Sequence, residues 1–213
     1  MARSIVPTMS AACVIGVDLG GTKLLAGVLD DQLNVHHRVY RHVHGLGQRE
    51  LIETVVAGVE EARAAAPGEV AAVGFGIPCL IDQRTGMALM AVNLPIADLA
   101  FRDVMAERIG LPVQVDNDAN VAALAEHRAG AARGTDHVVL LTVGTGIGGG
   151  LILNGRPYRG AIGAGAELGH MVIDLDGPRC QGTCPNRGCL EALASGTALA
   201  REGTRIARER PDS

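Results

Sequence analysis

The apolar positions in the first part of the chain change from strand-like to helix-like spacing. Short β-branched runs bounded by glycine or acidic residues predict strands at 13–17, about 24–29 and about 33–40. The acidic pair at 30–31 marks the tip of the hairpin between the second and third strands. Helical spacing follows over about 48–66 and stops at the Pro-Gly pair 67–68.

The alternation of strand and helix continues toward the C-terminus. Further strands are predicted at 70–76, 113–115 and 138–143, and the last has a hairpin partner at 149–153. Helices are predicted over about 98–109 and about 119–129. The stretch 155–188 is rich in glycine and proline, so we expect a long functional loop region with one strand at 171–175. Strands that alternate with helices indicate an α/β fold.

Two glycine-rich turns each follow a predicted strand. The first covers residues 18–23 (Asp-Leu-Gly-Gly-Thr-Lys) and the second covers residues 144–150 (Gly-Thr-Gly-Ile-Gly-Gly-Gly). Glycine accepts positive φ and lets backbone N–H groups approach an anion without an obstructing Cβ. Two such turns suggest a polyphosphate held between two similar lobes. A boundary near residue 116 gives each lobe one turn, with an N-terminal α/β lobe at 1–116 and a C-terminal α/β lobe at 117–213.

Composition excludes several classes of function. The chain has 213 residues, of which 47% are apolar and 20% charged, and this balance indicates a globular protein with an ample core. Aromatic residues make up only 2%, which argues against the stacking platforms of single-stranded nucleic-acid binders. A net charge of −4 gives no basic footprint for a duplex. We therefore expect no nucleic-acid partner.

Nothing in the sequence predicts a membrane segment. No apolar run approaches the roughly 18 residues that a spanning helix needs, and residues 1–12 do not read as a signal peptide. The expected compartment is the cytoplasm, with no membrane partner.

The five cysteines fall into two groups. Cys13 and Cys79 lie in apolar runs and are expected to be buried small hydrophobic residues. The other three are clustered, and together with His170 they offer three thiolates and one imidazole: Cys180, Cys184 and Cys189. This donor set suits a closed, structural, tetrahedral Zn²⁺ site. The alternative is a set of reduced free thiols with a surface histidine.

Several motifs together resemble the ROK family of sugar kinases and repressors, and within it the glucokinases. The motifs occur in family order between residue 13 and about residue 196: 18–23, 74–78, Asn117-Asp118-Ala-Asn120, 144–150, Glu167-Leu-Gly-His170 and the segment from Cys180 to Glu191. The resemblance implies the actin-like ATPase (ribonuclease H-like) fold, with two lobes that close over a sugar and a nucleotide. It also implies ATP and Mg²⁺ as cofactors, and a role in glycolysis and carbohydrate metabolism.

The resemblance assigns roles to the polar residues, and each has a simpler alternative. Asp118 is implied as the general base that takes the proton of the glucose 6-hydroxyl, whereas Asp116 or Asp118 would otherwise serve as a helix N-cap. The implied sugar-binding set is Asn93, Asn117, Asp118, Glu167, His170 and Glu191. For Asn117 the alternative is a turn residue, and for the two glutamates it is a solvated surface.

The glycine turns carry the implied nucleotide contacts. The residues concerned are Asp18, Gly20, Gly21, Thr22 and Lys23 in the first turn and Gly144, Thr145 and Gly146 in the second. An acidic residue beside phosphate needs a cation, so Asp18 is implied as a Mg²⁺ ligand, directly or through water. The alternatives are a turn-capping role for Asp18 and a solvated strand charge for Lys23.

The sequence departs from the family pattern in two places. Family members commonly have Cys-x-Cys followed by glycine, whereas Cys180 and Cys184 are separated by three residues and Pro185 follows. Cys180 reaches the metal only if the loop bulges. The chain also stops at Ser213, before a further glycine turn that would receive the adenosine. We expect an incomplete second lobe and a C-terminally truncated chain, and the alternative is a degenerate relative of the family.

These observations leave alternatives to a glucokinase. One is another ROK kinase that acts on fructose, mannose or an N-acetylhexosamine. Another is a catalytically incompetent sugar-binding fragment. A ROK repressor is disfavoured because only twelve residues precede the first strand, too few for a helix-turn-helix domain. The resemblance also implies a homodimer or homotetramer.

Overall fold

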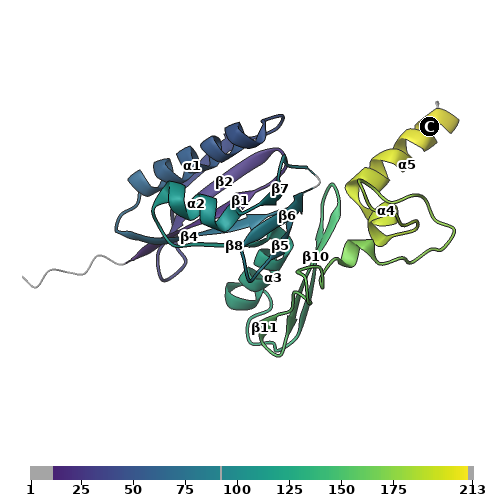
Figure 1. Cartoon of the computed structure of the whole chain (residues 1–213). Coiled ribbons are helices and arrows are strands. Elements are labelled where there is room, and N and C mark those ends of the chain that lie inside the picture. The colour runs from purple at the N-terminus through teal and green to yellow at the C-terminus, as the bar shows by residue number, and fades with distance from the viewer. Residues whose placement is uncertain (1–11, 92, 211–213) are drawn as a thin grey trace, which may run out of the picture. The chain divides into compact units, whose positions relative to one another are not determined.

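The computed structural model describes residues 12–91 and 93–210 (Figure 1). Internal contacts divide the chain into two compact units, one that ends at Asp116 and one that begins at Asn117. The expectation that no signal peptide is present concerns residues 1–12, and residues 1–11 lie outside the described part.

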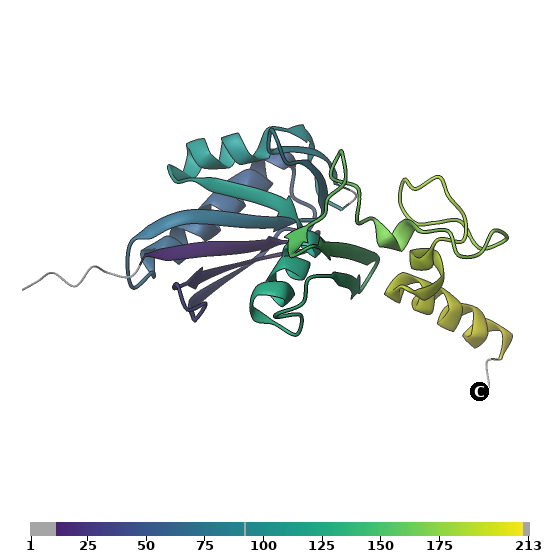
Figure 2. The ribbon, with the colours of Figure 1, turned by 90° about the horizontal axis from the view of Figure 1, so that it is seen from below.

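The first unit is built around a five-stranded sheet with the order β3-β2-β1-β4-β8, seen from below in Figure 2. The strands are β1 (Cys13–Leu19), β2 (Lys23–Leu29), β3 (Val35–His42), β4 (Val70–Ile77) and β8 (Val113–Asn117). Strand β1 pairs antiparallel with β2 and parallel with β4. Alternate residues of β1 are buried, as period-two patterning requires. Cys13 and Cys79 both lie in the core, which confirms their reading as buried hydrophobic residues.

Two helices contribute to the core of this unit. Helix α1 (Gln48–Ala64) lies against β2 and β3, and α2 (Phe101–Ile109) packs beside α1 (Figure 1). Helix α1 buries a stripe at helical spacing: Leu51, Val55, Val59 and Ala62. The predicted helix over 48–66 is therefore confirmed, with its end at Ala64.

A small second sheet in this unit was not predicted. It has the order β5-β6-β7, with β5 (Cys79–Asp82), β6 (Met87–Ala91) and β7 (Ala97–Leu99). Because β7 pairs with β6, its residues cannot start the helix that the sequence predicted from residue 98. Helix α2 begins at Phe101 instead.

The second unit holds a three-stranded sheet with the order β11-β10-β9, formed by β9 (Val138–Val143), β10 (Ile147–Leu153) and β11 (Arg156–Pro157). Helix α3 (Asp118–Ala129) packs on β9 and β10. A Cβ at Gly150 would lie 2.6 Å from the Ala119 carbonyl oxygen, so glycine is needed for the helix to come this close. The unit also contains a 3₁₀ helix η1 (Leu168–His170), α4 (Leu190–Ala194) and α5 (Gly196–Glu209).

The strand predicted at 171–175 is wrong. Only Val172 forms a bridge, with Cys189. The N–H groups of Ile173 and Asp174 both donate to the carbonyl of Gly188, at 2.9 and 3.2 Å, so no ladder continues. Leu175 is 87% exposed, and the apolar character of this segment therefore does not reflect burial.

Within residues 12–91 and 93–210, none of the helices combines the length and the apolar character needed to cross a membrane.

Candidate functional site

The first glycine turn joins β1 to β2. The Gly20 N–H closes the turn by donating to the Lys23 carbonyl at 2.8 Å. A Cβ at Gly21 would lie 2.7 Å from the Cβ of Asn93, so only glycine lets these two segments approach each other. The structure thus brings the predicted residue Asn93 to this turn. The exposed side chains at the turn are Asp18, Thr22 and Lys23.

The second glycine turn joins β9 to β10. The Gly144 N–H donates to the Gly146 carbonyl at 2.9 Å. Residues at the start of α5 donate hydrogen bonds to the carbonyl groups of the turn. Gly196 N–H donates to the Gly144 carbonyl at 2.8 Å, and the Thr197 hydroxyl donates to the Thr145 carbonyl at 2.8 Å.

Glu191 also contacts the second turn. Its Oε2 atom accepts a hydrogen bond from the Ile147 N–H at 2.7 Å, directly after the turn. A Cβ at Gly146 would collide with the same carboxylate oxygen. Glu191 was predicted to bind sugar, and the structure shows that one of its oxygens supports the glycine turn.

Asp118 is the first residue of α3, at the end of β8. The cap itself is Asn117, whose Oδ1 accepts from the N–H groups of Ala119 at 3.0 Å and Asn120 at 3.2 Å. The alternative in which Asp116 or Asp118 is the N-cap is therefore wrong. Asp118 Oδ1 accepts from Ala119 N–H at 2.9 Å, and the carboxylate lies at the positive end of the helix dipole.

Four of the predicted side chains come together in the second unit. Glu167 lies within electrostatic range of Asp118, His170 and Glu191, which come from different elements. Desolvation by its surroundings raises the pKa of the Glu167 carboxyl above its ordinary value, and the carboxylates of Asp118 and Glu191 act in the same direction. His170 acts in the opposite direction. Glu167 is partly exposed to solvent. Its carboxyl group nevertheless lies near two other carboxylates and an imidazole.

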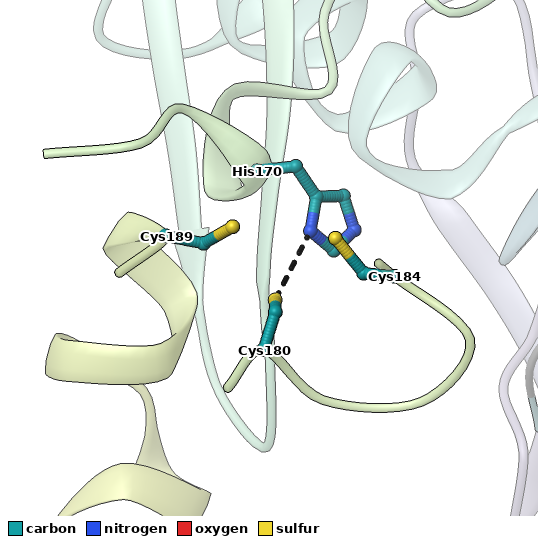
Figure 3. Close-up of side chains that lie close together, drawn as sticks. All are labelled: His170, Cys180, Cys184 and Cys189. Atoms are coloured by element: carbon teal, nitrogen blue, oxygen red, sulfur yellow. Dashed lines mark hydrogen bonds between the residues drawn. The ribbon is translucent and has the colours of Figure 1, made fainter. Parts of the chain in front are cut away.

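The three clustered cysteines and His170, which the sequence predicts as a set of metal ligands, lie close together in the structure (Figure 3). One ligand atom from each of His170, Cys180, Cys184 and Cys189 lies within 4.8 Å of the others. A tetrahedron with Zn–S bonds of about 2.3 Å places its sulfur atoms about 3.8 Å apart, so the four groups are near that arrangement. Three neutral thiols gain little by gathering, whereas a divalent cation would stabilise them as thiolates. The donor set thus fits Zn²⁺.

The insertion between Cys180 and Cys184 is accommodated by a bulged loop. The Cys180 N–H donates to the Asn186 carbonyl at 3.0 Å, and the Cys184 N–H donates to the Gln181 carbonyl at 3.3 Å. Cys180 Sγ lies 3.5 Å from His170 Nδ1. Cys180 therefore joins the cluster despite the unusual spacing.

Three of the polar residues that support this site were not predicted from the sequence. Gln181 lies in the cysteine loop, and Ser195 and Thr197 lie at the start of α5. Ser195 is the N-cap of α5, so its place before a helical segment was a readable signal. Its contact with Gln181 depends on tertiary packing and had no local signal.

Comparison with known proteins places these features in a family. The profile of the ROK family matches residues 14–211. A glucokinase of Thermotoga maritima is 41% identical over 191 residues, which cover 88% of this chain and 59% of that protein. A xylose repressor of Bacillus subtilis is 31% identical, over 87% of this chain and 48% of the repressor. The chain thus spans less than two thirds of the length of these curated relatives.

Solved structures share the fold. A ROK family glucokinase from Streptomyces griseus, in complex with glucose and AMPPNP, has a TM-score of 0.83 and 36% identity over 94% of this chain and 63% of its own. A ROK hexokinase from Thermus thermophilus has a TM-score of 0.80 and 42% identity over 92% of this chain and 64% of its own. These likenesses confirm the expected α/β class with the actin-like ATPase fold. The profile match, which extends over nearly the whole sequence, shows that the chain belongs to the ROK family.

Proposed function

We propose that the intact protein transfers the terminal phosphoryl group of ATP to the 6-hydroxyl of glucose. The observation that carries this proposal is the gathering of Asp118, Glu167, His170 and Glu191 in one unit, with Glu191 on a glycine turn. Neutral sugars are recognised by carboxylates and imidazoles that accept and donate several hydrogen bonds. The S. griseus structure, which holds glucose and an ATP analogue, supports both ligands.

In this proposal Asp118 is the general base. The sugar oxygen attacks the terminal phosphorus, the bond from that phosphorus to the bridging oxygen of ADP breaks, and the hydroxyl proton passes to the Asp118 carboxylate. Its position as the first residue of α3 sets this carboxylate at the positive end of the helix dipole. The remaining sugar hydroxyls are assigned to Asn93, Asn117, Glu167, His170 and Glu191.

The two glycine turns are assigned to the nucleotide. Backbone N–H groups of Thr145 and Gly146 would bind the terminal phosphates, whereas the N–H of Gly144 donates to the Gly146 carbonyl within the turn. The first turn would contribute Asp18, Gly20, Gly21, Thr22 and Lys23. Mg²⁺ bound with the nucleotide would neutralise phosphate charge during transfer, and Asp18 is the residue assigned to hold it.

We assign the cysteine cluster to a structural Zn²⁺. His170, Cys180, Cys184 and Cys189 fill four positions, which leaves none open for a reacting group. Because His170 Nδ1 faces Cys180 Sγ, the ring would use Nδ1 for the metal and keep Nε2 for the sugar. Ligation through Nδ1 would fix the orientation of the His170 imidazole, which this proposal also assigns to the sugar.

Compartment and assembly follow from the same reasoning. Thiols that bind metal favour a reducing compartment, so we place the protein in the cytoplasm, where glucose phosphorylation begins glycolysis. A homodimer or homotetramer is inferred from the family, and the mass of the intact protein in solution tests it.

The similarity to xylose repressors supports a second candidate function, in which the same fold binds a sugar without transferring phosphate. The alternative substrates for a kinase are fructose, mannose and an N-acetylated amino sugar.

One assay separates these readings. The intact protein is incubated with Mg-ATP and, in turn, glucose, fructose, mannose and an N-acetylated amino sugar, and ADP release is coupled to a colour change. We expect release with the highest kcat/KM for glucose. Sugar binding without ADP release for any member of the panel would contradict kinase activity and support the repressor reading.

A further inference from the structure

We propose that Gln181 is a positioning residue that connects the cysteine loop to the second glycine turn through Ser195. This inference rests on the proposed function only in naming phosphate as the ligand of that turn. The connection itself consists of hydrogen bonds within the second unit.

The first link joins Gln181 to the N-cap of α5. Gln181 Nε2 donates to Ser195 Oγ at 2.7 Å and lies 3.5 Å from the Glu191 carbonyl oxygen. Ser195 is fully buried, and its Oγ also accepts from the Ala198 N–H at 3.2 Å. A buried hydroxyl that caps a helix and receives a second hydrogen bond is fixed in place.

The second link joins the start of α5 to the glycine turn. The two residues after the cap, Gly196 and Thr197, hold the carbonyl oxygens of Gly144 and Thr145. A Cβ at Gly196 would lie 2.8 Å from the Gly144 oxygen, so the contact is too close for any other residue. The position of the cap therefore determines where these carbonyl groups point.

The consequence for phosphate binding follows from the geometry of the peptide bond. In a trans peptide the C=O and the following N–H point in opposite directions. When α5 holds the carbonyls of Gly144 and Thr145, the N–H groups of Thr145 and Gly146 point away from α5. These are the groups assigned to the phosphates, and Gln181 thereby orients phosphate donors that it does not contact.

The cysteine loop supplies the other end of the connection. Gln181 lies between the cluster residues Cys180 and Cys184, and its carbonyl accepts from the Cys184 N–H at 3.3 Å. Metal binding that orders these two cysteines would also order Gln181, which is one of the three residues between them. We therefore infer that an ordered cluster favours nucleotide binding, although no cluster residue lies in the turn.

The test compares Gln181→Ala with Thr183→Ala, an exposed position in the same loop, in the intact protein. Loss of one hydrogen bond to a buried group predicts that Gln181→Ala raises KM for ATP about 3- to 10-fold. The KM for glucose and the zinc content should stay unchanged. Amide hydrogen exchange at residues 144–147 should become faster in Gln181→Ala and not in Thr183→Ala.

A double-mutant cycle shows whether the effect passes through Ser195. In a Ser195→Ala background, Gln181→Ala should add little to the rise in KM for ATP or to the exchange rate. Additive effects, unchanged exchange at 144–147, or loss of zinc from Gln181→Ala would each overturn the inference. The exchange and zinc measurements need no turnover, so a protein without kinase activity would disprove the proposed function and leave this connection testable.

Discussion

The carboxylate of Glu191 accepts a hydrogen bond from the backbone N–H of Ile147, with 2.7 Å between Oε2 and the nitrogen. Glu191 lies in the first turn of α4, just after Cys189, and Ile147 is the first residue of β10. The acidic side chain thus joins the segment that follows the cysteine cluster to the segment that follows the second glycine turn. The same residue is also assigned to the sugar.

Replacing Glu191 separates its two contributions. Glu191→Ala leaves the buried Ile147 N–H without an acceptor, which should lower the free energy of unfolding by about 1–3 kcal/mol. Glu191→Gln keeps an oxygen acceptor and should retain most of that stability, while it loses the charge that strengthens hydrogen bonds to sugar hydroxyls. Denaturant unfolding and kcat/KM for glucose measure the two effects. Equal stability of the two variants would contradict a structural role for the carboxylate.

Gly146→Ala tests the space at the second turn. The new methyl group would displace the Glu191 carboxylate from Ile147, so kcat/KM for ATP should fall about 10- to 100-fold. The control is Gly203→Ala in α5, where a Cβ meets nothing within 4 Å. That change should leave activity intact and add up to about 1 kcal/mol of stability, because alanine favours a helix. Full activity of Gly146→Ala would show that the turn tolerates displacement of Glu191.

Metal analysis tests the cysteine cluster. The purified intact protein should contain about one zinc per chain, and chelation should lower its Tm. Cys184→Ser should lose the metal. Cys79→Ala is the matched control, because Cys79 lies in the core and burial raises the pKa of its thiol to about 11. Zinc retained by Cys184→Ser, or lost from Cys79→Ala, would contradict the assignment.

The hairpin tip at Asp30 predicts a pH-dependent contribution to stability. Hydrogen bonds from Asn34, with further contributions from His36 and Gln32, lower the pKa of the Asp30 carboxyl from 3.8 to about 2. Because the folded state favours the ionised form, the stabilisation is present above the ordinary pKa and is lost as pH falls toward 2. Asp30→Ala should therefore lower Tm near neutral pH, and the difference from the parent should shrink in acid. Asp31→Ala should show no such trend, and a pH-independent difference for Asp30→Ala would contradict this explanation.

Much of the fold could be predicted because local patterns coincide with burial. The strands on either side of the first glycine turn are short apolar runs, and the structure buries alternate residues of each run. The segment 171–175 shows the limit of such patterns. Its residues are apolar, yet a strand needs a partner, and the Gly188 carbonyl receives two successive N–H groups there instead.

Part of the candidate site could also be predicted from the sequence. Residue type and clustering indicated the four members of the cysteine cluster, since the chemistry of thiolate and imidazole ligands is specific. The contact between Gln181 and Ser195 was not predictable, because a glutamine in a loop has no pattern that names its partner. The cap at Asn117 was missed because three consecutive residues, Asp116 to Asp118, are all good capping types.

The most direct test of the account is the turnover of Asp118→Asn in the intact protein. Asparagine has nearly the same shape and can keep the acceptor at the start of α3, but it cannot take a proton from the sugar hydroxyl. We expect kcat to fall about 100- to 10,000-fold, while KM for glucose, zinc content and Tm stay close to the parent values. A variant that phosphorylates glucose as fast as the parent would contradict the role of Asp118 as the general base.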